Sequence, residues 1–126
     1  MTIVPTIIGT LYVGLKERAT DLLVPQETAL AVIQSYVNTV GLCVTVTPTQ
    51  FVYKDGHECG IAVGFINYPR FPSNREQIEQ HVAALAQLLL TACKQIRVSA
   101  VWADVTEMWT DTDRHVIAKA TPREGQ

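Results

Sequence analysis

The order of hydrophobic periodicities along the chain limits the possible folds more than any other feature. Two stretches have the spacing of amphipathic helices, one from Pro25 to Gly41 and one from Asn74 to Gln95. Between and around them, apolar and polar residues alternate as in strands with one buried face: Ile7–Leu15, Leu42–Thr49, Cys59–Tyr68 and Val98–Val105. The predicted order is therefore strand, helix, strand, strand, helix, strand.

Turn, capping and proline residues support these boundaries. Lys54–His57 contains Asp-Gly, which accepts the positive φ angles of a tight hairpin turn. Ser73 and Glu76 have the spacing of a capping box at the start of the second helix. Pro48 lies inside the second strand, which indicates an edge position or a bulge. A bulge would explain why the large residues Phe51 and Tyr53 switch parity beyond it.

Right-handed crossovers turn this order into the split βαβ arrangement. We therefore predict an α+β fold, a ferredoxin-like βαββαβ sandwich whose four-stranded antiparallel sheet carries both helices on one face. Residues 1–106 would form a single domain, a common size for one domain. Residues 107–126 would form a C-terminal extension, with a short extra strand at His115–Ala118 before a disordered tail.

The sheet face away from the helices is expected to meet a second copy of the chain. The strand Cys59–Tyr68 is apolar on both faces, and charged residues make up 17% of the chain against the usual share of about 25%. The outward residues are predicted to be Ala62, Ile66 and Tyr68, joined by Ala100 and Trp102. This pattern predicts a homo-oligomer built through the sheet face.

Composition and charge argue against several classes of partner. The net charge of −2 and a pI near 5.9 disfavour nucleic acid, whose binders are usually basic. The longest apolar runs are far short of a membrane span, and the first residues lack the basic region of a signal peptide. Three cysteines without a metal or redox spacing indicate free thiols in a cytoplasmic protein. His57 and Cys59 lack a third ligand, so no metal and no cofactor are expected.

Candidate ligand-binding residues gather at the loop before the second helix. Tyr68, Arg70 and Arg75 lie near the amino end of that helix, where free amides and the helix dipole favour a small anion. A well-built strand-to-helix loop would require much the same residues. Tyr12 and Asp104 complete the candidates, and Asp104 with Glu107 forms the best carboxylate pair for acid–base work, with exposed strand-end charges as the alternative.

Two segments carry a resemblance to known proteins. Leu11-Tyr12-Val13-Gly14-Leu15 and the stretch from Val63 to Pro72 resemble small uncharacterised bacterial and phage proteins of ferredoxin-like build. The resemblance spans about residues 7–106 and implies the same fold. Those families have no agreed activity, so the resemblance implies no catalytic residue.

No nucleophile elbow, phosphate-binding glycine loop or dinucleotide fingerprint is present in the sequence. The leading interpretation is therefore a small homo-oligomeric binding or interaction protein without catalytic activity. The alternative is a small enzyme of the dimeric α+β type that acts on a small metabolite, either anionic or uncharged. Its pocket would lie between sheet and helices or at the interface between two chains. The fold itself hosts both classes.

Overall fold

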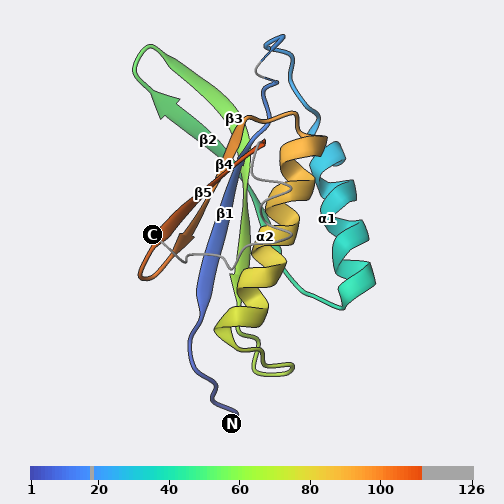
Figure 1. Cartoon of the computed structure of the whole chain (residues 1–126), viewed down its shortest axis with the longest axis vertical. Coiled ribbons are helices and arrows are strands. Elements are labelled where there is room, and N and C mark those ends of the chain that lie inside the picture. The colour runs from blue at the N-terminus through green and yellow to red at the C-terminus, as the bar shows by residue number, and fades with distance from the viewer. Residues whose placement is uncertain (18, 112–126) are drawn as a thin grey trace.

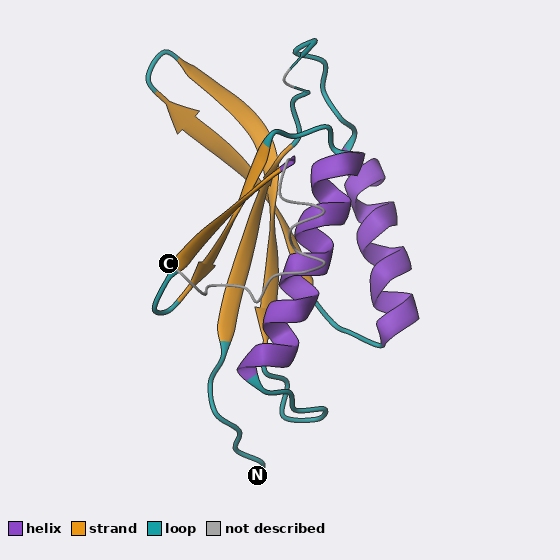
Figure 2. Ribbon diagram, in the orientation of Figure 1, coloured by secondary structure: helices purple, strands orange, loops and turns teal. Residues whose placement is uncertain are grey.

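The computed structural model describes residues 1–17 and 19–111 and contains five strands and two helices among them. Along the chain these are β1 (Ile8–Gly14), α1 (Gln26–Val40), β2 (Thr45–Tyr53), β3 (Gly56–Ile66), α2 (Arg75–Ala92), β4 (Arg97–Trp102) and β5 (Thr106–Thr110). One sheet forms a layer, and both helices pack on the same side of it, with α2 nearer to the sheet than α1 (Figures 1 and 2).

The sheet is antiparallel, with the strand order β2-β3-β1-β4-β5. The α+β class predicted from the sequence is confirmed, but the predicted count of four strands is wrong. After β4 the chain turns back at once, and the Trp102 amide donates to the Val105 carbonyl at 2.8 Å. This tight turn brings Thr106–Thr110 alongside β4 as a fifth strand. The short strand predicted at His115–Ala118 lies outside the described residues.

The helices cover one face of the sheet and form the core with it. The buried strand residues are Leu11, Val13, Ile61, Val63, Phe65, Val98, Ala100 and Trp102, and they pack against α2 through Ile78, Val82, Leu85, Ala86 and Leu89. Helix α1 buries only Ala29 and Ile33. The second helix therefore supplies most of the cover over the sheet.

The prediction that Ala100 and Trp102 lie on the open face is wrong. In an antiparallel pair, directly opposed residues point to the same side of the sheet. Ala100 pairs with the buried Leu11, and Trp102 pairs with Gly9. A side chain at Gly9 would lie 2.8 Å from the indole ring, so the glycine makes room for Trp102 beneath the helices.

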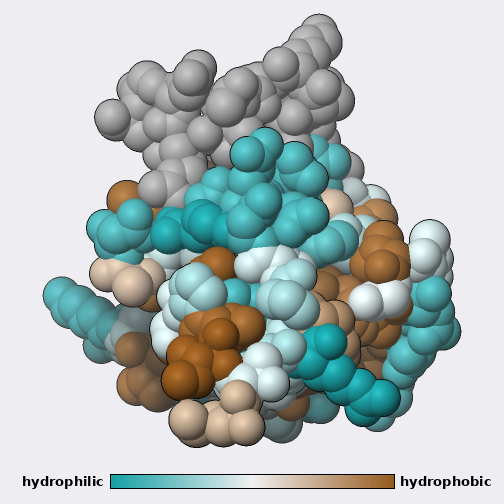
Figure 3. All heavy atoms as spheres, turned by 90° about the horizontal axis from the view of Figure 1, so that it is seen from below, coloured by the Kyte–Doolittle hydropathy of each residue, from teal (hydrophilic) through white to brown (hydrophobic). Residues whose placement is uncertain are grey.

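The open face nevertheless carries exposed apolar side chains. The large ones are Ile8, Tyr12, Ile66, Val101 and Met108, which are between 36% and 59% exposed. They share that face by register: Ile8 opposes Ile66, Thr10 opposes Val101, and Ser99 opposes Met108. Seen from below, the molecule also shows hydrophobic patches among polar atoms (Figure 3).

Strand β2 is an edge strand, as Pro48 indicated, but it has no bulge. Its pairing with β3 runs without interruption from Thr45 opposite Gly64 to Tyr53 opposite Gly56. The prediction of a bulge is wrong because the parity switch has another cause. Phe51 points to the open face, together with the threonines of the same strand, and is not turned toward the helices.

The helix ends follow the expected chemistry with one shift. Gly41 ends α1 in the left-handed conformation, at φ 72°. The capping box of α2 is formed by Asn74 and Gln77, one residue later than the predicted pair of Ser73 and Glu76. Asn74 accepts from the Gln77 amide at 2.8 Å, and Gln77 accepts from the Asn74 amide at 2.9 Å. Within the described residues, no helix is long and apolar enough to cross a membrane.

Candidate functional site

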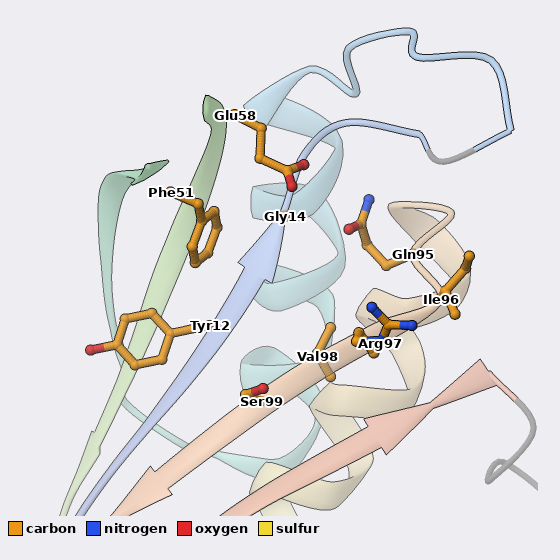
Figure 4. Close-up of a pocket in the computed structure, with 9 residues that line it drawn as sticks. All are labelled: Tyr12, Gly14, Phe51, Glu58, Gln95, Ile96, Arg97, Val98 and Ser99. Atoms are coloured by element: carbon orange, nitrogen blue, oxygen red, sulfur yellow. The ribbon is translucent and has the colours of Figure 1, made fainter. Parts of the chain in front are cut away.

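A hollow of about 210 Å³ opens on the sheet face that the helices leave uncovered. It lies where β1 ends and β4 begins, beside the far part of the β2–β3 hairpin (Figure 4). We call it the open-face pocket. Its lining residues are Tyr12, Gly14, Phe51, Glu58, Gln95, Ile96, Arg97, Val98 and Ser99. Four separate segments therefore meet at one small depression.

The hairpin brings an aromatic ring and a carboxylate to this pocket. Asp55 takes φ 61° in the turn, which allows β2 and β3 to pair closely. The resulting register sets Phe51 opposite Glu58. Gly60 is required beneath them, because a Cβ at that position would lie 2.2 Å from the Phe51 ring. Tyr12 meets Phe51 edge to face, with ring centroids 6.5 Å apart.

Glu58 has an unusual environment for a carboxylate. Its Oε2 atom is buried, and among the described residues it has no hydrogen-bond partner. Leaving a charged acceptor unpaired away from water costs free energy. Figure 4 shows this carboxylate directed toward the end of β1, over Gly14. The group can accept a hydrogen bond from a donor, and it favours a cation.

Gln95 faces Glu58 from the connection between α2 and β4. Lys94 adopts φ 52° as the chain leaves the helix, and Gln95 is then only 7% exposed. Its amide nitrogen donates to the carbonyls of Lys16 and Cys93, both at 2.9 Å. Arg97 and Ser99 follow on β4 along the same side of the sheet (Figure 4).

Of the five residues predicted to bind a ligand, Tyr12 lies in the open-face pocket. Arg75 and Asp104 lie together on the helix side, where Arg75 Nη2 is 3.0 Å from Asp104 Oδ1. Arg75 Nε is also 2.7 Å from Glu79 Oε2, and the guanidinium stacks over Trp102 at 4.3 Å from the ring centroid. Its charge is thus balanced by two carboxylates.

The predicted carboxylate pair serves two different partners. Asp104 contacts Arg75, whereas Glu107 is buried and accepts a hydrogen bond from Trp102 Nε1 at 2.8 Å. The residues Arg75, Asp104, Glu107, Glu79 and Trp102 form what we call the tryptophan cluster. The ion pairs of Arg75, its stacking on Trp102 and the hydrogen bond from Trp102 to Glu107 all join members of this cluster, which is typical of a group that stabilises the fold.

Tyr68 and Arg70 lie in the loop before α2. The Tyr68 ring packs against Phe71 at 5.4 Å between centroids, and a hydrogen bond with the Cys43 side chain raises the pKa of Tyr68. Arg70 is exposed. The capping box already satisfies one amide at the start of α2, so fewer amides are left for an anion. The anion site at this loop stays a prediction. Among the described residues, no cluster of three or more potential metal ligands occurs.

Three other titratable groups, His81, Tyr36 and Cys93, lie away from the pocket. His81 is half-buried between the helices, and its Nδ1 lies 2.7 Å from Tyr36 Oη. Burial lowers the pKa of His81 and raises that of Tyr36. Burial also raises the pKa of the Cys93 thiol to about 11. These groups belong to the helix layer.

The sequence analysis missed most of the open-face pocket, namely Phe51, Glu58, Gln95, Arg97 and Ser99. The hairpin gave only a partial signal for the first two, because it predicts that their strands pair. An Asp-Gly turn would pair Tyr53 with Glu58, whereas the structure turns at Lys54 and Asp55 and pairs Phe51 with Glu58. Gln95 carried no such signal, because its position depends on where the chain lies after the second helix.

No protein-family model matches this chain, and no curated protein matches it. Two solved structures have a similar fold. A phage SAM lyase in complex with S-methyl-5′-thioadenosine gives a TM-score of 0.70 at 15% identity, over 87% of this chain and 93% of that chain. A phage SAM lyase in the apo state gives 0.67 at 16% identity, over 82% and 88% respectively. At such identity the likeness shows that this chain shares the α+β fold of those lyases.

Proposed function

We propose that this chain is a small enzyme that binds S-adenosylmethionine, or a closely related sulfonium nucleoside, in the open-face pocket. Breaking the bond between its sulfur and Cγ of the methionine part, as the carboxylate oxygen of that part bonds to Cγ, would release S-methyl-5′-thioadenosine and homoserine lactone. The observation that carries this proposal is the Glu58 carboxylate beside the Tyr12–Phe51 aromatic pair, since its buried Oε2 atom has no partner among the described residues. The fold shared with the phage SAM lyases supports it, although fold by itself does not determine function.

The chemistry of the pocket suits such a ligand. S-Adenosylmethionine carries a net positive charge and a flat purine. Aromatic faces attract cations by about 0.5–2 kcal/mol, and a hydrogen bond to a charged group contributes about 1.5–3 kcal/mol. Tyr12 and Phe51 offer the rings, and Glu58 offers the charge. A cationic ligand therefore fits this pocket better than the anionic metabolite considered from the sequence.

The enzyme alternative drawn from the sequence is thus better supported than the non-catalytic interpretation. Both similar solved structures are lyases, and one holds a small nucleoside. In this chain, the absence of a nucleophile motif does not argue against such a reaction. The sulfur of a sulfonium can leave with its bonding electrons as a neutral thioether while the substrate's own carboxylate oxygen bonds to the carbon it leaves, so the reaction does not require a nucleophilic side chain.

The enzyme is proposed to work as a homo-oligomer assembled through the open face. A hollow of about 210 Å³ is smaller than the roughly 300–1,000 Å³ typical of ligand pockets, so one chain encloses only part of a nucleoside. Ile66, Val101 and Met108 lie exposed on the same face. A second copy could cover them and close the pocket. Sedimentation of the unmodified protein as a monomer at micromolar concentration would contradict this arrangement.

Glu58→Gln tests the proposed activity. The unmodified protein should convert S-adenosylmethionine to S-methyl-5′-thioadenosine, measured by chromatography. The variant should lose at least about tenfold in affinity for S-adenosylmethionine, measured by calorimetry, since it loses a charge contact of about 1.4 kcal/mol or more. Glu76→Gln, an exposed carboxylate in the first turn of α2, is the matched control and should behave as the unmodified protein. If the unmodified protein neither binds nor cleaves S-adenosylmethionine, the proposal is wrong.

A further inference from the structure

Two oxygen atoms converge at one end of the open-face pocket. A Cβ placed on Gly14 would lie 2.6 Å from Gln95 Oε1 and 3.4 Å from Glu58 Oε2. Both oxygens therefore border the same small volume, which stays open because residue 14 has no side chain. Figure 4 shows the two side chains directed toward Gly14 from opposite sides, Glu58 from β3 and Gln95 from the start of the β4 segment.

The direction of the Gln95 oxygen follows from its hydrogen bonds. Its Nε2 group donates to the carbonyls of Lys16 and Cys93, so both amide protons are in use. The reversed amide would bring its oxygen against two carbonyl oxygens, which is unfavourable. Gln95 therefore presents an acceptor, and not a donor, to the volume over Gly14.

The two groups are complementary to a protonated amine. Glu58 Oε2 and Gln95 Oε1 are both acceptors, and the first has no partner among the residues described. An ammonium group has three donors and a positive charge, so it can satisfy both oxygens at once. A carboxylate or phosphate at this position would be repelled.

A cation lies beside this acceptor pair. Arg97 lines the same pocket, two residues beyond Gln95 along the chain, and is exposed. Figure 4 shows both Arg97 and Gln95 among the side chains that border the pocket. A planar guanidinium matches a carboxylate, and the fork can bind both oxygens. Acceptors for an ammonium and a guanidinium for a carboxylate thus border the same pocket.

We propose that this end of the pocket recognises an α-amino acid head group. The ammonium would bind Glu58 Oε2 and Gln95 Oε1, and the carboxylate would bind Arg97. This inference deepens the proposed function, since it assigns the methionine part of S-adenosylmethionine to the Gly14 end of the pocket. It leaves the nucleoside part to Tyr12 and Phe51. It also predicts weaker binding of S-methyl-5′-thioadenosine, which has no such head group.

Three small probes test the head-group site: L-methionine, 3-(methylthio)propylamine, which lacks the carboxylate, and 4-(methylthio)butanoate, which lacks the amine. Each is titrated while the Gly14 amide and the Gln95 side-chain amide are followed by NMR. L-Methionine should shift both signals at millimolar concentration. Each probe with one charged group should bind at least about tenfold more weakly than L-methionine, because one of the two charge contacts is missing.

Variants with matched charge changes assign the two halves of the site. Glu58→Gln should weaken L-methionine and the amine but leave the butanoate unchanged. Arg97→Met should weaken L-methionine and the butanoate but leave the amine unchanged. Lys54→Met, at the exposed hairpin turn, removes a charge elsewhere and should change none of the affinities. Both pocket substitutions replace side chains for which no stabilising hydrogen bond is described, so the variants should fold, as their NMR spectra will report.

The result that overturns the inference is specific. L-Methionine that shifts neither signal at tens of millimolar, or that binds Glu58→Gln and Arg97→Met as tightly as the unmodified protein, excludes a head-group site. Failure of the proposed function looks different. In that case the unmodified protein releases no S-methyl-5′-thioadenosine from S-adenosylmethionine, while L-methionine still shifts Gly14 and Gln95.

Discussion

The two faces of the sheet each carry aromatic and acidic side chains, but they use them differently. On the covered face, Trp102 donates to Glu107 at 2.8 Å and lies under Arg75, which in turn contacts Asp104. On the open face, Tyr12 and Phe51 lie beside Glu58, whose Oε2 has no partner in the described part of the chain. Similar residue types thus stabilise the fold where they satisfy one another, and leave binding capacity where they do not.

The contrast also bears on how a small domain acquires a binding site. A buried, unpaired carboxylate lowers the stability of the folded state, and a ligand that pairs with it restores the loss. The tryptophan cluster lies at the amino end of α2 and holds β4, β5 and that helix together. The open-face pocket lies where the sheet has no cover. Substitutions in the two regions should therefore have opposite effects on stability and binding.

The largest difference in the free energy of unfolding is expected between substitutions of an aromatic residue on the covered face and of one on the open face. Trp102→Ala should lower the free energy of unfolding by about 3–5 kcal/mol, because the indole is 5% exposed and its removal leaves a cavity in the core. Tyr12→Ala should cost about 1 kcal/mol, since Tyr12 is 36% exposed on the open face. Urea unfolding measures both values. Equal losses would mean that the open face is packed as firmly as the core.

The difference in stability between the two faces should be smaller for substitutions of the carboxylates. Glu107→Ala removes the acceptor of the buried Trp102 Nε1 group and should cost about 1–3 kcal/mol. Glu58→Ala should leave stability unchanged or raise it, because it removes a buried Oε2 atom that has no partner among the described residues. Thermal unfolding without ligand compares the two. A marked loss of stability in Glu58→Ala would show that this carboxylate serves the fold after all.

The smallest effect on stability is expected on the exposed apolar surface. Met108→Asp changes a side chain that is 59% exposed, so the free energy of unfolding of one chain should shift by no more than about 0.5 kcal/mol. If the chain assembles through the open face, the same substitution should dissociate it, as sedimentation will show. Leu22→Asp, equally exposed but in the loop before α1, is the control and should leave assembly intact.

The sequence predicted parts of the site unevenly. Tyr12 is one of the candidate polar groups named from the sequence, and it lines the open-face pocket. Arg75 and Asp104 were also selected, and they pair with each other on the helix side. The difference is one of register. The sequence shows that a charged residue lies near the end of a helix or strand. It does not show which side chain of a neighbouring strand or helix contacts that residue.

Local periodicity and turn chemistry determined most of the fold. The alternation in β1 and β3, the Asp-Gly hairpin and the helix stop at Gly41 all act over a few residues, so they can be read directly from the chain. They were sufficient for the α+β class and for the strands that flank each helix. They placed Pro48 on an edge strand, although they also suggested a bulge that is absent.

Only the tertiary structure decided which face of β4 is buried and where the pocket lies. Trp102 faces the helices because β4 pairs with β1 in a register that sets it opposite Gly9. Glu58 and Gln95 come together because the start of β3 and the connection after α2 both lie beside Gly14. Pairing register and the contact of segments far apart in the chain depend on how whole elements pack. No short stretch of sequence contains that information, because its free energy arises only when the elements are assembled.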